Sequence, residues 1–267
     1  MRTLLSLAAT AAAAYGLVLA LLWWGQEKLL FLPTPLPAEH RFAFGDDVHE
    51  TWIDVDGARL NALHLRLPQP AGVVFYLHGN AGNLQSWFVN ADFYRRLNLD
   101  LFMIDYRGYG KSSGRITSEA QLHADVRAAW AAMQRAYVGT PPPRRIVTGR
   151  SLGTGPATLL ATEVQPELLM LISPYSSLRA LAAEHYAWVP QALLRYPLPT
   201  DDWIGRVRSP IVLVHGERDD LIEPAHSRRL QALVPRARLL LVPDAGHNDL
   251  QGFPAYLEGV AAALRGP

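Results

Sequence analysis

The stretch that decides the fold is residues 145–164, RIVTGRSLGTGPATLLATEV. It starts as an apolar, β-branched run, passes through Gly149-Arg150-Ser151-Leu152-Gly153, and continues as an apolar segment of helical length. A G-x-S-x-G motif between a strand and a helix is typical of a sharp turn that lifts a serine hydroxyl above the sheet. The stretch therefore predicts a strand, a tight turn and a helix, with Ser151 as a candidate nucleophile.

The same alternation of strand-like and helix-like segments continues along the chain in both directions. We expect strands at residues 52–55, 60–67, 73–77, 101–104, 145–148, 168–172, 211–214 and 239–242. We expect helices at residues 84–97, 119–137, 152–164, 225–233 and 256–264. The first two strands have no helix between them, which indicates a hairpin, while the later apolar runs are typical of buried parallel strands. The sequence thus predicts an α/β fold with a mostly parallel central sheet of about eight strands and helices on both faces.

Polar loops follow several of these strands directly. In open α/β sheets, functional residues gather at the carboxyl ends of the strands, so we expect these loops to lie at one edge. One of them contains Arg107, for which we favour support of a turn over substrate binding. The loops are His78-Gly79-Asn80-Ala81-Gly82-Asn83, Asp105-Tyr106-Arg107-Gly108-Tyr109-Gly110, Gly149-Arg150-Ser151-Leu152-Gly153, His215-Gly216-Glu217-Arg218-Asp219 and Gly246-His247-Asn248-Asp249.

A serine nucleophile needs a general base close to it. His247 is the candidate base, because it follows the last strand in a loop that can reach the edge above Ser151. Three other histidines follow the serine in sequence. We expect His215, ahead of a glycine, to be structural, His226 to lie on a surface helix, and His185 to lie in an insertion.

The base in turn needs an orienting carboxylate. Asp219 follows the penultimate strand at the apex of its loop and is the candidate acid. Its neighbour Asp220 is the alternative, with a turn or helix-entry carboxylate as its structural role.

Together, the five loop sequences resemble those of the α/β-hydrolase superfamily in type and in order. The resemblance is closest to the Bem46-like branch, which includes the membrane-associated α/β-hydrolase domain-containing proteins 13 and 17, and it extends from about residue 29 to the C-terminus. It implies an α/β-hydrolase fold and serine hydrolase chemistry. Proteins of the 17 type carry a Cys-rich palmitoylated N-terminus, whereas this chain has no cysteine, so their substrate is not carried over.

The resemblance also implies roles for individual residues. The acid in the resembled pattern is the third residue after the His-Gly pair, which selects Asp219 over Asp220. Leu152, directly after the nucleophile, and Asn80, directly after His78-Gly79, would donate their backbone N–H groups to the oxyanion. We expect no cofactor and no metal, since the nine histidines of the sequence form no metal-ligand pattern.

The N-terminus has a different composition from the rest of the chain. Residues 4–24 carry no charge and end in Trp23-Trp24, as at an interfacial aromatic belt, and their number is sufficient to span a bilayer. We favour a transmembrane anchor at residues 1–25 over a signal peptide cleaved near Ala12-Ala13-Ala14, because apolar residues continue well past Ala14. Arg2 predicts a cytoplasmic N-terminus and an extracytoplasmic head, and a cleaved signal would instead give a secreted or periplasmic protein. A proline-containing linker would follow at residues 26–50, and the hydrolase domain would occupy residues 51–267.

Residues 174–207 form a longer connection than a plain crossover and are rich in aromatic side chains. They are expected either to form a small cap that lines an acyl pocket, with Trp188 and Trp203 as candidate substrate-binding residues, or to pack into the core.

Composition and motifs leave three classes of function. A net charge of +1 gives no electrostatic reason to expect a nucleic-acid partner, and the lack of cysteine excludes thiolate catalysis. The favoured function is hydrolysis of small esters or thioesters. A peptidase or amidase of the same fold and a non-catalytic membrane scaffold are the alternatives.

Overall fold

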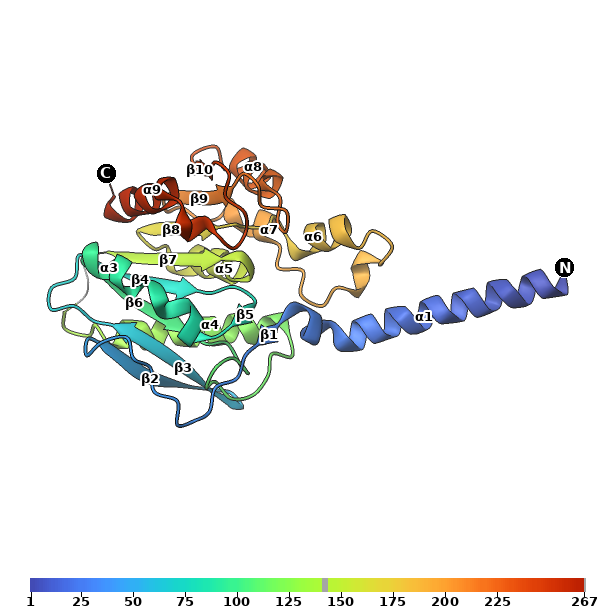
Figure 1. Ribbon diagram of the computed structural model, residues 1–267, viewed down its shortest axis with the longest axis horizontal. Coiled ribbons are helices and arrows are strands. Elements are labelled where there is room, and N and C mark those ends of the chain that lie inside the picture. The colour runs from blue at the N-terminus through green and yellow to red at the C-terminus, as the bar shows by residue number, and fades with distance from the viewer. Residues whose placement is uncertain (141–143, 267) are drawn as a thin grey trace.

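A mixed sheet of eight strands forms the centre of the computed structural model, which describes residues 1–140 and 144–266 (Figure 1). The order across the sheet is β10-β9-β8-β7-β4-β6-β3-β2. Only β3 runs against its neighbours, β2 and β6, so the predicted hairpin and mostly parallel sheet are confirmed. The strands are β2 (Val48–Val55), β3 (Ala58–Leu65), β4 (Gly72–Leu77), β6 (Leu99–Ile104), β7 (Arg145–Arg150), β8 (Leu168–Ile172), β9 (Ile211–Gly216) and β10 (Arg238–Val242).

Several strands extend beyond the apolar runs that predict them. β7 continues through Gly149 to Arg150, which pairs with Ile172 of β8. β9 likewise continues to Gly216, and β2 starts at Val48, opposite Leu65. The ladder depends on backbone groups, so polar residues at the end of a strand continue it without adding to the apolar pattern.

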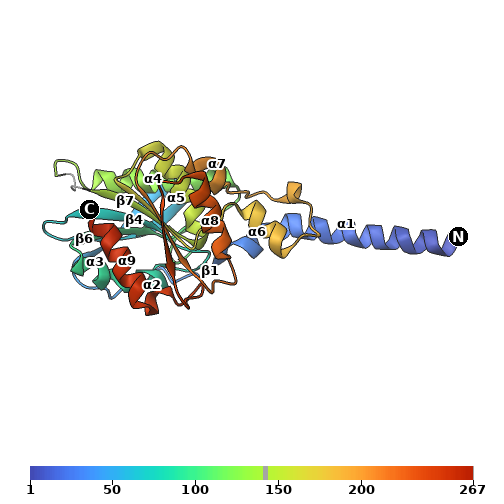
Figure 2. The same cartoon turned by 90° about the horizontal axis from the view of Figure 1, so that it is seen from above.

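Helices cover both faces of this sheet (Figure 2). On one face, α4 (Glu119–Arg135), α5 (Thr154–Val164) and α8 (Pro224–Leu233) contribute side chains such as Val126, Leu160 and Leu230 to one apolar core. On the other face, α3 (Ala91–Arg96) and α9 (Pro254–Arg265) contribute Tyr94 and Val260 to a second core. The sheet is therefore buried on both sides, as near-continuous apolar strands require.

The helix predicted at residues 84–97 is wrong as a single element. The structure has three short pieces there: α2 (Leu84–Trp87), the 3₁₀ turn η1 (Phe88–Asn90) and α3. Asn83 caps α2 by accepting a hydrogen bond from the Gln85 N–H. Aromatic and β-branched residues, followed by Asn90, have modest helix propensity, and the chain bends where they occur in succession.

The N-terminal helix α1 (Arg2–Leu30) projects away from the sheet (Figure 1). It is long and apolar enough to cross a membrane by length and composition. The helix continues five residues past the expected end of the anchor, to Leu30. The short strand β1 (Leu32–Pro33) then pairs with β5 (Ala81–Gly82), which follows β4, so this part of the expected linker is docked on the sheet domain.

Residues 174–207 hold α6 (Leu178–His185), the 3₁₀ turn η3 (Gln191–Leu193) and α7 (Thr200–Ile204). α7 packs on α5 and α8, so the end of this stretch belongs to the helical layer. The part around α6 and η3 lies beside the base of α1 (Figure 1). The remaining short elements are the 3₁₀ turns η2 (Ser151–Gly153) and η4 (Leu250–Gly252).

Candidate active site

Ser151 lies in a strained turn at the end of the central strand β7. Its φ of 49° is in the left-handed region, which non-glycine residues seldom adopt and which often accompanies functional sites. Gly149 and Gly153 make the turn possible: a Cβ at Gly149 would overlap the carbonyl of Gly153, and one at Gly153 would overlap the carbonyl of Leu77 on β4. The turn predicted from the G-x-S-x-G motif is therefore present, and its glycines are needed for close backbone approach.

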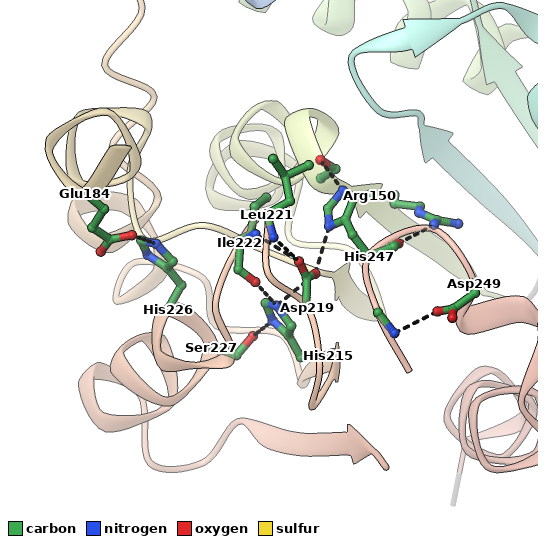
Figure 3. Close-up of polar contacts among 12 residues, drawn as sticks. Arg150, Glu184, His215, Asp219, Leu221, Ile222, His226, Ser227, His247 and Asp249 are labelled. Atoms are coloured by element: carbon green, nitrogen blue, oxygen red, sulfur yellow. Dashed lines mark hydrogen bonds and ion pairs between the residues drawn. The ribbon is translucent and has the colours of Figure 1, made fainter. Parts of the chain in front are cut away.

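Ser151, His247 and Asp219 form one hydrogen-bonded chain. The Ser151 hydroxyl donates to His247 Nε2 over 3.1 Å. His247 Nδ1–H in turn donates to the carboxylate of Asp219 over 2.8 Å (Figure 3). Nδ1 faces a carboxylate that can only accept, so it carries the proton and leaves Nε2 free as the acceptor. All three side chains are at least nine-tenths buried. The arrangement can take a proton from the serine as its oxygen attacks an electrophile.

Asp219, and not Asp220, orients the histidine. Asp219 is 3% exposed, whereas the adjacent Asp220 lies in solvent. The second carboxylate oxygen of Asp219 accepts the N–H groups of Leu221 and Ile222, at 3.1 and 2.9 Å. Burial raises the pKa of Asp219, but hydrogen bonds from His215 and His247 outweigh it and hold the pKa below its usual range. The carboxylate is thus ionised at neutral pH.

His215 contacts the carboxylate of Asp219 in addition to His247. Its Nε2 lies 3.3 Å from the Asp219 carboxylate and 2.7 Å from the carbonyl of Ile222 (Figure 3). Both groups are acceptors, so Nε2 carries the proton, while Nδ1 accepts from the Ser227 hydroxyl over 2.7 Å. The expected structural role of His215 is therefore confirmed, and it acts on the acid of the site.

Arg150 holds the loop that carries His247. Its guanidinium donates to the backbone carbonyl of His247 over 2.9 Å (Figure 3). It also lies 5.3 Å from the ring centre of Trp87. Arg150 occupies the variable position before the nucleophile, where the motif prescribes no side chain. Sequence reasoning missed this residue for that reason.

The two expected oxyanion donors come from neighbouring strands. Leu77, at the end of β4, is in register with Gly149, near the end of β7, so the loop with Asn80 lies beside the turn with Leu152. A Cβ on Gly79 would be 3.7 Å from the Cβ of Ser151, which shows how close this loop comes. Within residues 1–140 and 144–266, the N–H groups of Asn80 and Leu152 have no hydrogen-bond acceptor. They are available to a ligand, as oxyanion donors must be.

Two buried tyrosines fix the loop that contains Asn80. The Tyr106 hydroxyl donates to the carbonyl of His78 over 2.9 Å, and the Tyr109 hydroxyl donates to the carbonyl of Asn80 over 2.7 Å. Both come from the loop after β6, the neighbour of β4 in the sheet. The sequence pattern around Tyr106 and Tyr109 does not predict these hydrogen bonds.

The structure gives Trp188 and Trp203 partners other than the candidate nucleophile. Trp188 is half exposed and lies beside α1, where its carbonyl accepts from the Tyr15 hydroxyl over 2.8 Å. Trp203 packs against the core under α5 and meets the ring of His123 edge-on at 5.3 Å. Their proposed place in an acyl pocket has no support from these contacts, because α1 occupies the outer side of the cap and α7 is part of the helical layer.

The other polar candidates have structural partners. Arg107 forms a buried, two-pronged ion pair with Asp125 of α4, with N–O distances of 2.6 and 2.8 Å, so it supports its turn as expected. His226 is buried, and the expected surface position is wrong: its Nδ1 accepts from Ser176, and its Nε2–H donates to Glu184 of α6 over 2.9 Å (Figure 3). Side chains of α6 cover this part of α8, which the sequence of α8 alone could not reveal. Among the described residues, no group of three or more His, Asp or Glu side chains could hold a metal ion.

Comparison with protein families identifies two matching stretches. A family model described as serine aminopeptidase, S33, matches residues 68–200, and one described as alpha/beta hydrolase fold matches residues 194–251. The chain is 35% identical over 270 residues to an uncharacterized protein from Mycobacterium tuberculosis, covering 97% of this chain and 91% of that one. It is 33% identical over 210 residues to human α/β-hydrolase domain-containing protein 17B, covering 76% and 69%. It is 34% identical over 215 residues to protein 17C of Xenopus tropicalis, covering 78% of this chain and 66% of that relative's length.

Solved structures resemble the fold at lower sequence identity. An esterase from Pyrococcus furiosus superimposes with a TM-score of 0.69 at 19% identity, covering 86% of this chain and 96% of the esterase. An α/β serine hydrolase without a lid from Xanthomonas campestris gives a TM-score of 0.58 at 18% identity, covering 85% and 94%. These likenesses establish the α/β-hydrolase fold.

Proposed function

The chain belongs to the α/β-hydrolase superfamily, in the family of α/β-hydrolase domain-containing protein 17, and from this membership we propose that it hydrolyses carboxylic ester or thioester bonds of short-to-medium acyl substrates. The observation that carries the proposal is the buried hydrogen-bonded chain from Ser151 through His247 to Asp219, beside two backbone N–H groups that have no acceptor among the residues that the structure describes. Each of its parts has a role in acyl transfer.

In the proposed reaction, Ser151 Oγ attacks the acyl carbonyl while His247 Nε2 takes its proton. The N–H groups of Asn80 and Leu152 stabilise the negative charge on the carbonyl oxygen, which is worth about 3–4 kcal/mol for each donor. His247 then protonates the leaving alcohol or thiol, and the acyl group remains on Ser151. Water, activated by the same histidine, releases the acid, while Asp219 keeps the imidazole in the required tautomer and stabilises the imidazolium.

An amide substrate is the second candidate. It is favoured by the family model described as serine aminopeptidase, which matches residues 68–200. The same nucleophile and base can cleave an amide, but the leaving amine has to be protonated more fully as it departs. The choice of substrate class therefore depends on measured rates.

We also propose that α1 anchors the enzyme in a membrane. It presents 29 residues of high mean hydropathy, and large apolar side chains such as Leu5, Leu17 and Leu21 are exposed along it. Exposed apolar surface of this extent is unfavourable in water and favourable in a bilayer. The substrate would then be a small acyl ester or thioester that reaches the head beside a bilayer.

The proposal is tested by comparing leaving groups on the purified full-length protein in detergent. p-Nitrophenyl esters and acyl thioesters from acetyl to decanoyl, together with aminoacyl anilides, are assayed for kcat/KM. We expect esters or thioesters to be preferred, with rates rising to about hexanoyl or octanoyl as each buried methylene contributes about 0.8 kcal/mol. Preferential anilide cleavage would favour the peptidase, and no turnover of any substrate would favour a scaffold.

Ser151→Ala is the matched control for this assay. The substitution removes one buried oxygen, so the protein should keep its fold and lose nearly all turnover and all labelling by a fluorophosphonate. Turnover that persists at the parent rate in Ser151→Ala would contradict the assignment of the nucleophile.

A further inference from the structure

The segment from Leu32 to Leu36 lies on the loop that carries the expected oxyanion donor Asn80. Its three available N–H groups all donate to loops at this edge: Leu32 to the Asn80 carbonyl over 2.8 Å, Thr34 to the Gly82 carbonyl over 3.1 Å, and Leu36 to the Gly110 carbonyl over 2.7 Å. β1 and β5 pair in parallel within this contact, at the base of α1 (Figure 1). The chain leaving the N-terminal helix is thus bonded directly to the candidate active site.

The prolines of this segment fit the contact. Pro33 and Pro35 alternate with the donating residues, and successive backbone N–H groups of an extended chain point in opposite directions. Proline has no N–H, so it stands at the positions that face away from the loops. It also restricts φ, which keeps the segment extended before it docks.

The carbonyl of Asn80 is held from two sides. Besides the Leu32 N–H, it accepts the hydroxyl of the buried Tyr109 over 2.7 Å. A further hydrogen bond joins the same two segments, because the Asn83 side chain donates to the carbonyl of Thr34 over 2.8 Å. Two donors on one carbonyl fix the peptide plane that follows Asn80.

We propose that the segment Leu32–Leu36 positions the oxyanion hole by fixing the conformation of Asn80, an inference that rests on the proposed hydrolase function. The peptide plane between Asn80 and Ala81 is set by the Leu32 N–H and the Tyr109 hydroxyl. The preceding peptide plane, between Gly79 and Asn80, carries the Asn80 N–H that would face the oxyanion. With both the carbonyl of Asn80 and the carbonyl of His78 held, the direction of the Asn80 N–H has little freedom. Oxyanion donors depend on such prior alignment, because a donor that must reorient contributes less to the transition state.

The first test removes the Leu32 N–H from this contact. Leu32→Pro deletes the donor, and Leu32→Ala shortens the same half-exposed side chain while keeping the donor. Phe31 already has extended backbone angles, with φ −115° and ψ 117°, which a following proline requires. The ratio of the two variants therefore reports the replacement of this N–H by the proline ring, and Tyr109→Phe tests the same carbonyl without adding an atom.

Both variants are measured as full-length protein in detergent, with the best ester of the parent as substrate. Relative to Leu32→Ala, we expect Leu32→Pro to lower kcat by about 10- to 100-fold with KM changed by less than about twofold, because loss of a whole oxyanion donor costs about 10²- to 10³-fold. Affinity for phenylboronic acid, which forms a tetrahedral adduct with a reactive serine, should fall by a similar factor. Thermal unfolding midpoints of the two variants should agree within a few degrees.

Equal kcat and equal boronate affinity in the two folded variants would overturn the inference. If Leu32→Pro does not fold, Tyr109→Phe gives the decision, since it removes the second donor to the same carbonyl and leaves the ring in place. A folded Tyr109→Phe with the kcat of the parent would also overturn it. Failure of the proposed function is seen separately, as a parent protein that neither turns over esters, thioesters and anilides nor reacts with a fluorophosphonate.

Discussion

Replacing Asp219 with asparagine tests the proposed mechanism most directly. One carboxylate oxygen accepts His247 Nδ1–H at 2.8 Å, and the other accepts two backbone N–H groups, from Leu221 and Ile222. An asparagine side chain puts one oxygen and one NH₂ group at the positions of these two carboxylate oxygens. The two backbone donors require the oxygen, so the NH₂ group has to face His247 and also His215.

This exchange predicts the size of the effect. An NH₂ donor opposite Nδ1 favours the tautomer in which His247 carries its proton on Nε2, facing Ser151, where it cannot accept the serine proton. A loss of about 10⁴-fold in kcat is expected for such an inverted tautomer, equivalent to about 5.5 kcal/mol in the transition state. The fold should persist, since the volume of the side chain is nearly unchanged.

The control is Asp220→Asn, which alters the exposed neighbour in the same loop. Steady-state rates of Asp219→Asn, Asp220→Asn and the parent are compared on one ester at neutral pH, together with their unfolding midpoints. We expect the first to be nearly inactive and the second to remain within about threefold of the parent. A larger loss in Asp220→Asn than in Asp219→Asn would refute the assignment of the acid and the tautomer argument with it.

Three further predictions concern stability and location. Asp125→Asn leaves the buried guanidinium of Arg107 without its charged partner, so it should lower the free energy of unfolding, measured in urea, by about 3–5 kcal/mol and leave KM unchanged. An altered KM at parental stability would instead give Arg107 a role in substrate binding. Burial lowers the pKa of His64 to about 3, below its value of about 6.5 in the unfolded chain, so only the unfolded chain gains this proton as the pH falls from about 6.5 toward 3. The free energy of unfolding should therefore decrease over this range by up to about 1.4 kcal/mol per pH unit. His64→Gln should flatten this part of the curve of unfolding midpoint against pH. The full-length protein should stay in the membrane fraction after a carbonate wash, whereas deletion of residues 2–25 should release it; a mature N-terminus near Ala14 by mass spectrometry would show a cleaved signal instead.

The sequence was sufficient for the parts of the molecule that have strong local signals. Alternating or continuous apolar runs identified the eight strands of the main sheet, and G-x-S-x-G between a strand and a helix identified the turn at Ser151. His247 and Asp219 could be paired with it because each follows a strand, and strand ends meet at one edge. At residues 84–97 the buried apolar residues Leu84, Phe88, Ala91 and Tyr94 keep the spacing of one helical face, so periodicity predicts a single helix and does not locate the breaks between the three pieces.

The contacts of the N-terminal segment were beyond such reasoning. Prolines at 33, 35 and 37 indicate a non-helical chain, but they do not say whether it is free or docked. Docking depends on carbonyl groups of residues 80, 82 and 110, which every residue type carries. The cap was ambiguous for a related reason: aromatic side chains suit a pocket and a packing surface equally, and the partners Tyr15 of α1 and His123 of α4 are far from Trp188 and Trp203 in sequence.

The residues that sequence reasoning missed share one mode of action, since each donates to a backbone carbonyl of a candidate catalytic loop. Tyr106 holds His78, Tyr109 holds Asn80, Tyr175 holds Leu152 over 2.9 Å, and Arg150 holds His247. All four donor side chains are at least nine-tenths buried, so these bonds are shielded from water. A motif specifies the residue that performs the chemistry, whereas the direction of its N–H or ring depends on donors that reach the main chain from neighbouring strands. Loops held in this way are aligned before any substrate binds, which is the condition under which backbone N–H groups and a single histidine contribute most to acyl transfer.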